Sequence, residues 1–185
     1  MRCNKIGVLI IEDNPGDATI IEEMLNELKM ELDIRVARDG LEAVHVLEGR
    51  CLDLPDMIIL DLNLPKLNGY EVLKFIKGDG GLKAIPVVVM TGSLRKEDET
   101  RSRDMGAADY CIKPATVAEM DKVTACLKGN LEPIYCGKWR GNCPGTSADA
   151  GLGPRSRSQY ARSVPYHKEP QIMDIAWPEL RYEFH

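Results

Sequence analysis

Long apolar runs are absent from this chain of 185 residues. No apolar stretch approaches the roughly 18 residues that a membrane span requires, so membrane insertion is not expected. The apolar stretch at residues 6–11 is too short for a secretory signal, and no small-residue cleavage site follows it. We therefore expect a cytoplasmic protein.

Concentrated basic charge is also lacking. The net charge is −5, whereas binding to a phosphate backbone needs clustered lysine and arginine, so direct nucleic-acid binding is not expected. The six cysteines include no C-x-x-C pair, and free thiols are therefore the expectation in a reducing cytosol.

Short apolar runs alternate with helical patterns five times between residues 5 and about 130. The predicted strands lie at residues 6–11, 33–37, 57–60, 86–90 and 109–112, and the last helix is expected to end near Lys128. Continuously apolar strands suit a sheet that is buried on both faces. The alternation of strands and helices therefore predicts an α/β fold with a parallel sheet between two helical layers.

The composition changes after residue 136. Residues 137–185 hold five Gly, five Pro and seven basic against five acidic residues, a net charge of +2, which leaves −7 for residues 1–136. We predict one domain at 1–136 and an irregular tail at 137–185 without a recognisable output domain. The tail is too short and too weakly basic for a helix-turn-helix, which argues against a transcription factor.

Reactive side chains stand where four of the predicted strands end: Glu12-Asp13, Asp61, Thr91 and Lys113. The carboxyl ends of strands are the ligand-binding edge of open α/β sheets. Carboxylates crowded there repel one another unless they share a cation, and hard oxygen ligands suit Mg²⁺. Asp61 is then a candidate nucleophile towards phosphorus, with Lys113 and the metal neutralising the phosphoryl charge. The simpler alternative is that Asp61 only caps the following turn.

This set of residues resembles the receiver domain of two-component response regulators. The run Gly106–Tyr110 before Lys113-Pro114 strengthens the resemblance, which covers residues 5 to about 130. The segment around Asp61, including Asn63-Leu64-Pro65, is similar to small stand-alone regulators of phytochrome-like or other sensor histidine kinases. The resemblance implies a flavodoxin-like, doubly wound (βα)5 sheet with strand order 2-1-3-4-5.

The resemblance also implies a catalytic and a metal-binding role for individual residues. Asp61 would accept a phosphoryl group from a kinase phosphohistidine, and Lys113 would pair with that group. Mg²⁺, with Mn²⁺ as an alternative, would be held by Glu12, Asp13, Asp61 and the backbone carbonyl of Asn63.

Further residues would respond to the phosphoryl group. Thr91 would move towards it and Tyr110 would swing inward as the switch, although Tyr110 is alternatively a half-buried structural aromatic. Asn63 and Ser93 would tune the lifetime of the phosphate. The Lys113–Pro114 peptide bond would be cis.

The implied function is a phosphorylation-controlled switch that alters protein contacts. Its partners would be a sensor histidine kinase or phosphotransfer protein and a downstream protein target, and homodimerisation is common in the family. Such a protein catalyses its own phosphorylation and dephosphorylation but does not turn over an external substrate.

Two alternatives have a different chemistry. A phosphatase of the haloacid-dehalogenase type usually needs a second Asp two positions after the nucleophile, where this chain has Asn63. A pseudo-receiver is a phosphorylation-independent interaction module, which usually lacks one of the acids or the lysine, and this chain keeps them all.

One segment departs from the family pattern. Residues 95–104, where the fourth helix belongs, contain eight charged residues and no apolar one. Charge pairs four residues apart contribute only about 0.2–0.5 kcal/mol each. We therefore expect this helix to be loosely held, and its polarity argues against homodimerisation through that face.

Overall fold

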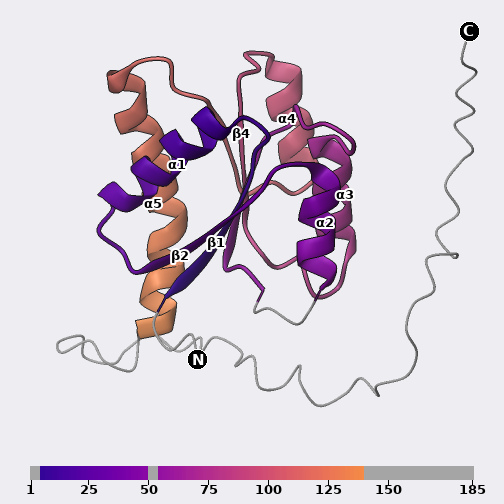
Figure 1. Ribbon diagram of the computed structural model, residues 1–185, viewed down its shortest axis with the longest axis horizontal. Helices are drawn as coiled ribbons and strands as arrows, with labels where there is room; N and C mark the ends of the chain where they lie inside the picture. The colour runs from indigo at the N-terminus through magenta and orange to yellow at the C-terminus, as the bar shows by residue number, and fades with distance from the viewer. Residues whose placement is uncertain (1–4, 50–53, 140–185) are drawn as a thin grey trace, which may run out of the picture. The chain divides into compact units, whose positions relative to one another are not determined.

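The computed structural model describes residues 5–49 and 54–139 and forms a parallel sheet between two layers of helices (Figure 1). The strand order is β2-β1-β3-β4-β5, which confirms the predicted flavodoxin-like topology. The strands are β1 (Ile6–Ile11), β2 (Leu32–Ala37), β3 (Met57–Leu60), β4 (Val87–Thr91) and β5 (Asp109–Ile112). The helices are α1 (Pro15–Glu27), α2 (Gly40–Glu48), α3 (Gly69–Gly78), α4 (Lys96–Asp104) and α5 (Val117–Trp139).

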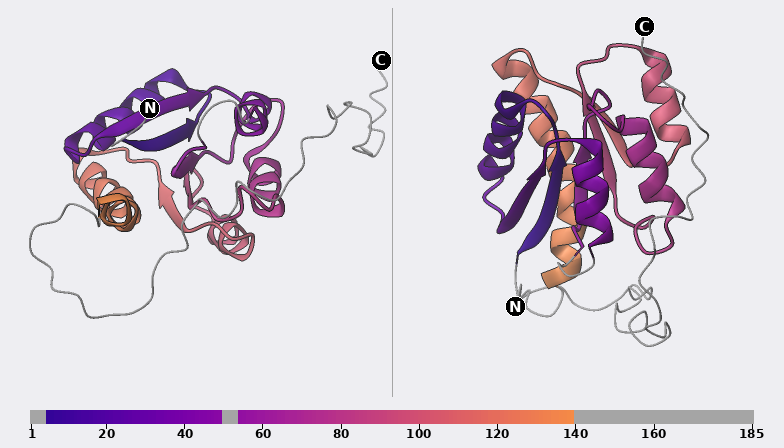
Figure 2. Two further views of the ribbon diagram at one scale, coloured as in Figure 1. Left: turned by 90° about the horizontal axis from the view of Figure 1, so that it is seen from below. Right: turned by 45° about the vertical axis from the view of Figure 1, so that its right-hand side comes forward.

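Each face of the sheet has its own hydrophobic core, with α1 and α5 on one side and α2, α3 and α4 on the other (Figure 2). Side chains alternate along β1, so Leu9 and Ile11 pack towards α2 and α3, whereas Val8 and Ile10 pack towards α1 and α5. All six residues of β1 are buried. The uninterrupted apolar run in the sequence is therefore the consequence of two covered faces.

Two glycines bring α2 and α3 against the loop that follows β3. A Cβ on Gly69, the first residue of α3, would lie 2.3 Å from the carbonyl oxygen of Asp61. A Cβ on Gly40, the first residue of α2, would lie 2.0 Å from the carbonyl oxygen of Leu67. Neither contact leaves room for a side chain, so backbone meets backbone on both sides of this loop.

Helix α5 is longer than the sequence suggested. It continues past Lys128 to Trp139, although Gly129 and Pro133 fall within it. An internal proline costs about 3 kcal/mol because it removes a hydrogen bond and its ring meets the carbonyl four residues earlier. The buried side chains of Leu127 and Leu131 continue along the core-facing side and offset this cost.

The predicted boundary at residue 136 lies inside α5 and stays a prediction. Residues 137–139 of the predicted tail belong to α5. Residues 140–185 lie outside the described residues. Within residues 5–49 and 54–139, no helix combines the length and the apolar character needed to cross a membrane.

Replacing Leu131 with alanine tests the extension of α5. Leu131 is fully buried, so we expect Leu131→Ala to lower the free energy of unfolding by about 2–5 kcal/mol in urea titrations. The neighbouring, exposed Glu132 provides a control, and Glu132→Ala should change it by less than about 0.5 kcal/mol. Equal effects of the two changes would show that α5 does not pack beyond Lys128.

Candidate functional site

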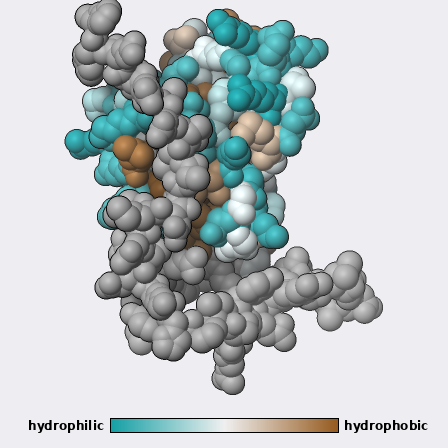
Figure 3. All heavy atoms as spheres, turned by 90° about the vertical axis from the view of Figure 1, so that its right-hand side faces the viewer, coloured by the Kyte–Doolittle hydropathy of each residue, from teal (hydrophilic) through white to brown (hydrophobic). Residues whose placement is uncertain are grey.

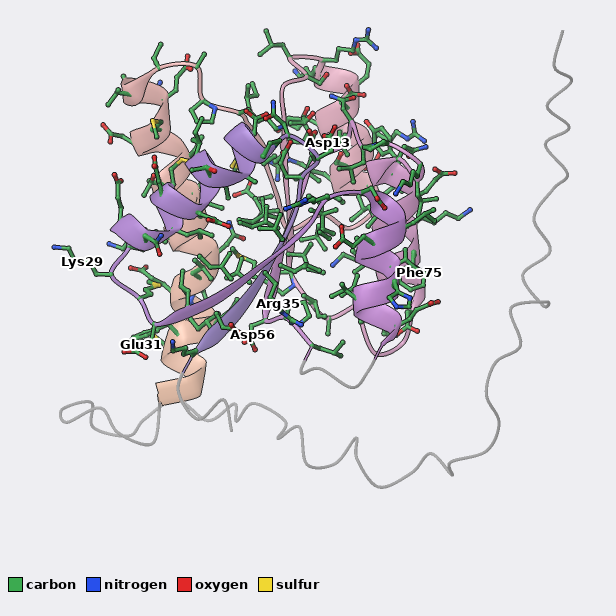
Figure 4. The ribbon with its side chains drawn as sticks, viewed as in Figure 1. Asp13, Lys29, Glu31, Arg35, Asp56 and Phe75 are labelled. Atoms are coloured by element: carbon green, nitrogen blue, oxygen red, sulfur yellow. The ribbon has the colours of Figure 1, made fainter. Side chains whose placement is uncertain are left out.

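The carboxyl ends of β1, β3, β4 and β5 bring the predicted reactive residues to one edge of the sheet. Ile11 pairs with Leu60, so Glu12 and Asp61 each follow directly after paired residues. The pairing of β4 with β5 ends at Thr91, and Lys113 comes immediately after it. Figure 4 shows Asp13 at this edge, whereas Asp56 lies towards the opposite end of the sheet.

Lys113 is the centre of the site. Its Nζ atom lies 2.6 Å from Asp61 Oδ2, 2.7 Å from Glu12 Oε2 and 2.9 Å from Asp17 Oδ2. Burial alone would lower the pKa of Lys113, but the close contacts with these three carboxylates outweigh burial and raise that pKa. The lysine is therefore charged, and its one positive charge is shared among three acids.

Asp17 was missed as a site residue in the sequence. Its position in the first turn of α1, soon after the strand-end acids, is compatible with a contact to Lys113, but nothing in the spacing singles it out.

Glu12, Asp13 and Asp61 form a group of carboxylates suited to a divalent cation. Their ligand oxygens lie within 4.8 Å of one another, with Glu12 and Asp61 buried and Asp13 exposed. Glu12 Oε1 accepts the N–H of Asn14, but the buried Oε2 accepts no well-directed hydrogen bond even though Lys113 is close. Oxygen ligands with free lone pairs and excess negative charge fit Mg²⁺ or a similar ion.

Burial raises the pKa of Glu12, and Lys113 only partly opposes this effect. The carboxylate of Asp61 has a different environment, because Oδ1 accepts the backbone N–H of Asn63 at 3.1 Å while Oδ2 contacts Lys113. Two carboxylates of one cluster thus differ in how well their charge is compensated.

Thr91 lies fully buried at the end of β4, and its hydroxyl is only weakly hydrogen-bonded. Its Oγ1 accepts from Asn63 Nδ2 and from the N–H of Ser93, both at 3.4 Å. The sequence-predicted residues Thr91, Asn63 and Ser93 are thus in direct contact beside Asp61.

The described residues contain no cis peptide bond, so the Lys113–Pro114 bond is trans. The predicted cis bond is therefore wrong for this structure. The trans form is the ordinary preference of an X–Pro bond by about 0.5–1 kcal/mol. In this form the N–H of Lys113 already bonds the carbonyl of Thr91 at 2.9 Å, and the side chain reaches the carboxylates.

A family model of the response regulator receiver domain matches residues 8–125. The chain belongs to this family. The receiver domain is the signal-receiving module of two-component systems, and this protein is accordingly a two-component response regulator.

Similar proteins support this assignment. The probable methanogenesis regulatory protein FilR2 of Methanothrix harundinacea is 37% identical over 124 residues, which cover 65% of this chain and 80% of FilR2. Response regulator Rcp1 of Synechocystis is 35% identical over 120 residues, which cover 63% of this chain and 82% of Rcp1.

Solved receiver structures have the same fold. The Mn²⁺-bound form of Rcp1 matches with a TM-score of 0.63 and 32% identity, over 67% of this chain and 92% of Rcp1. The phosphorylated cyanobacterial phytochrome response regulator RcpA matches with a TM-score of 0.63 and 34% identity, over 67% of this chain and 91% of RcpA. The narrower resemblance to phytochrome-type regulators is thereby confirmed.

Helix α4 of this receiver domain is attached mainly by polar contacts. Asp98 accepts hydrogen bonds from the hydroxyls of Tyr70 in α3, at 2.7 Å, and of Ser93, at 2.5 Å. The guanidinium of Arg101 lies over the Tyr70 ring, 3.9 Å from its centroid. Figure 3 shows the side of the domain that carries α2 to α4, and the coloured surface in its upper part is mainly hydrophilic.

This polar attachment was not foreseen from the sequence, because neither periodicity nor charge pattern connects Tyr70 with Asp98. Hydrogen bonds from Ser93 and Tyr70 lower the pKa of Asp98. Burial and the bond to Asp98 raise the pKa of Tyr70 to about 12. Tyr110, the predicted switch residue, joins this region, since its half-buried side chain donates to the carbonyl of Ser93 at 3.0 Å.

The pH dependence of stability tests the burial of Glu12. Its raised pKa means that folding favours the protonated form, so the stability it contributes below its ordinary pKa of 4.5 is lost as pH rises through the raised value. Glu12→Gln stays neutral, and we expect its free energy of unfolding to gain on wild type as pH rises above about 4.5 in chelator-treated samples. A flat or falling difference for Glu12→Gln would contradict the prediction.

Hydrogen exchange tests how firmly α4 is held. We expect weak amide protection at Glu97–Arg103 in the wild type, and strong protection there would refute the loose attachment. Tyr70→Phe removes one bond to Asp98 but keeps the ring, and should speed this exchange about 2- to 12-fold, as the loss of about 0.5–1.5 kcal/mol implies. Exchange in α1 serves as the control and should not change.

Proposed function

We propose that this response regulator is a switch in which Asp61 accepts a phosphoryl group from the phosphohistidine of a sensor histidine kinase or phosphotransfer protein. The observation that carries this proposal is the geometry at Asp61. Its carboxylate is buried within the acid cluster, and Lys113 Nζ lies 2.6 Å from one of its oxygens. A strand-end carboxylate beside a half-buried ammonium is suited to attack phosphorus and to keep the product's charge neutralised.

In the proposed transfer, an oxygen of Asp61 attacks phosphorus while the bond from phosphorus to the histidine nitrogen breaks. The N–H of Asn63 holds Oδ1 of Asp61 in place. Oδ2, which now contacts Lys113, is therefore the oxygen that gives up this contact and bonds to phosphorus. Lys113 then pairs with a phosphoryl oxygen instead of with the carboxylate. Its additional contact with Asp17 keeps the ammonium at the site during this exchange.

Bound Mg²⁺, or Mn²⁺ in its place, would supply further positive charge for the phosphoryl oxygens. Glu12, Asp13 and Asp61, with the backbone carbonyl of Asn63, are the residues that we assign to hold it, and the fit of the carboxylate cluster described above supports this assignment. The relative Rcp1 has been crystallised in a Mn²⁺-bound form, which also supports it.

The response to phosphorylation is assigned to the side of β4. Thr91 Oγ1 has only two bonds of 3.4 Å to give up when a phosphoryl oxygen becomes its partner. A shift of Thr91 affects Ser93, and Ser93 contacts both Tyr110 and Asp98 of α4. We assign Asn63 and Ser93, which flank Asp61 on this side, to the control of phosphate lifetime.

The change at α4 and β5 alters contacts with a downstream protein target, and no turnover of an external substrate is proposed. The alternative is a pseudo-receiver that acts without phosphorylation. The acids are retained in contact with Lys113, and Thr91 is retained beside Asn63. This favours the phosphorylated switch over this alternative. Direct nucleic-acid binding and homodimerisation are not part of the proposal.

Intact mass spectrometry after incubation with Mg²⁺ and acetyl phosphate tests the transfer. We expect the wild type to gain one phosphoryl group only in the presence of the metal, because Asp61 is the single acceptor. Asp61→Ala should show no gain, and Lys113→Ala should label at least about 10-fold more slowly, as the loss of one charge-stabilising contact implies.

Asp56→Asn is the matched control, since Asp56 lies towards the opposite end of the sheet (Figure 4). It should be labelled like the wild type. Labelling of Asp61→Ala to the wild-type level would place the acceptor elsewhere. A wild type that neither gains mass with candidate kinases nor binds beryllofluoride would favour the pseudo-receiver.

A further inference from the structure

Two thiols meet between β5 and α5, on the side of the sheet that α1 and α5 cover. Cys111 of β5 is buried, Cys126 of α5 is half-buried, and their Sγ atoms lie 2.6 Å apart. Val123 and Leu127 of α5 are buried in the same core as Cys111, so helix packing holds Cys126 in this position. The proposed phosphotransfer uses neither cysteine.

Polar contacts connect this thiol pair to α4. Cys126 Sγ donates to Asp109 Oδ2 at 3.2 Å, and Asn130 Nδ2 reaches the same oxygen at 3.3 Å. The other oxygen of Asp109 binds Arg103 Nη2 at 3.2 Å, and Arg103 Nε binds Glu99, also at 3.2 Å. A change at Cys126 therefore alters the carboxylate that binds a residue of α4.

The two sulfurs also differ in how readily they lose a proton. Contact with Cys126 lowers the pKa of Cys111 in spite of its burial. Contact with Cys111, burial and the bond to Asp109 together raise the pKa of Cys126. A pair with one acidified thiol is suited to oxidation, because the thiolate is the reactive form of cysteine.

We propose that Cys111 and Cys126 form a redox modification site that reacts with a peroxide and closes as an intramolecular disulfide between β5 and α5. The contact between the two sulfurs carries this inference, since a disulfide requires the two side chains to face one another at close range.

The chemistry balances with one hydrogen peroxide. One thiolate attacks the O–O bond and becomes a sulfenic acid, and the departing hydroxide takes up a proton to leave as water. The second sulfur then attacks the sulfenic sulfur, the S–S bond forms, and a second water leaves. Two thiols and one peroxide thus give one disulfide and two waters, and the two electrons lost by the thiols reduce the O–O bond.

Closure has two structural consequences. It removes the S–H that Cys126 donates to Asp109, which weakens one end of the connection to Arg103 in α4. It also fixes α5 covalently to β5, two residues before Lys113. Disulfide formation does not require phosphorylation of Asp61, so this modification can be tested independently of the proposed function.

The test treats the full-length protein with hydrogen peroxide, blocks free thiols with N-ethylmaleimide and maps crosslinked peptides by mass spectrometry. We expect a crosslink between the peptides that contain Cys111 and Cys126, reversed by dithiothreitol. The 15-residue separation of the two cysteines predicts a rise in Tm of about 6–12 °C in the oxidised protein.

Cys136, which is exposed in the same helix, provides the matched control. Cys136→Ser should keep the crosslink and the Tm shift, and Cys126→Ser should lose both. A variant in which the cysteines other than Cys111 and Cys126 are serine measures the pair alone, and peroxide should prevent maleimide labelling of both remaining thiols.

Three outcomes would overturn the proposal. The first is a wild type whose crosslinks join other cysteines while Cys111 and Cys126 remain free to react with maleimide. The second is oxidation of either sulfur to sulfinic acid without a crosslink. The third is an undiminished Tm shift in Cys126→Ser.

Discussion

The structure depends on one half-buried ammonium group, that of Lys113, among several carboxylates. Without Lys113, the buried acids Glu12 and Asp61 would face each other uncompensated at the end of a sheet that is otherwise apolar. Removing one partner of a buried ion pair usually destabilises a protein by about 3–5 kcal/mol. Lys113 therefore holds the ends of β1, β3 and β5 and the first turn of α1 in one arrangement. The charge that the proposed phosphotransfer needs is the same charge that stabilises the site.

The fold and most of the site were predictable because parallel strands place their carboxyl ends together. Once the apolar runs are recognised as strands, Asp61 and Lys113 become neighbours although 52 positions separate them. The contact between Tyr70 and Asp98 could not be predicted in this way, since it joins two helices whose relative position depends on packing. The length of α5 was also missed, because burial of Leu131 outweighs the local preference against Pro133.

Helix α4 shows how a strongly polar segment can still belong to a packed domain. Ser102 is its only buried residue among those described, and the hydroxyl of Ser102 bonds the carbonyl of Asp98 within the helix. The contacts from Tyr70, Ser93 and Arg101 replace the apolar stripe that the other helices use. Each such bond contributes only about 0.5–1.5 kcal/mol net. The α4 side of this regulator is therefore held by bonds that can be exchanged one at a time.

The close packing at Gly69 and Gly40 has a consequence for the direction of any conformational change. The loop after β3 is wedged between two helix ends with backbone against backbone, so it has almost no freedom to yield when charge is added at Asp61. Across the site, a Cβ added to Gly92 would meet no atom within 4 Å, and the hydroxyl of Thr91 has only long hydrogen bonds, both of 3.4 Å. The loop after β3 is thus tightly packed, whereas the end of β4 is loosely packed. A phosphoryl group added at Asp61, as proposed, would therefore displace the β4 side, because packing holds the loop after β3 in place.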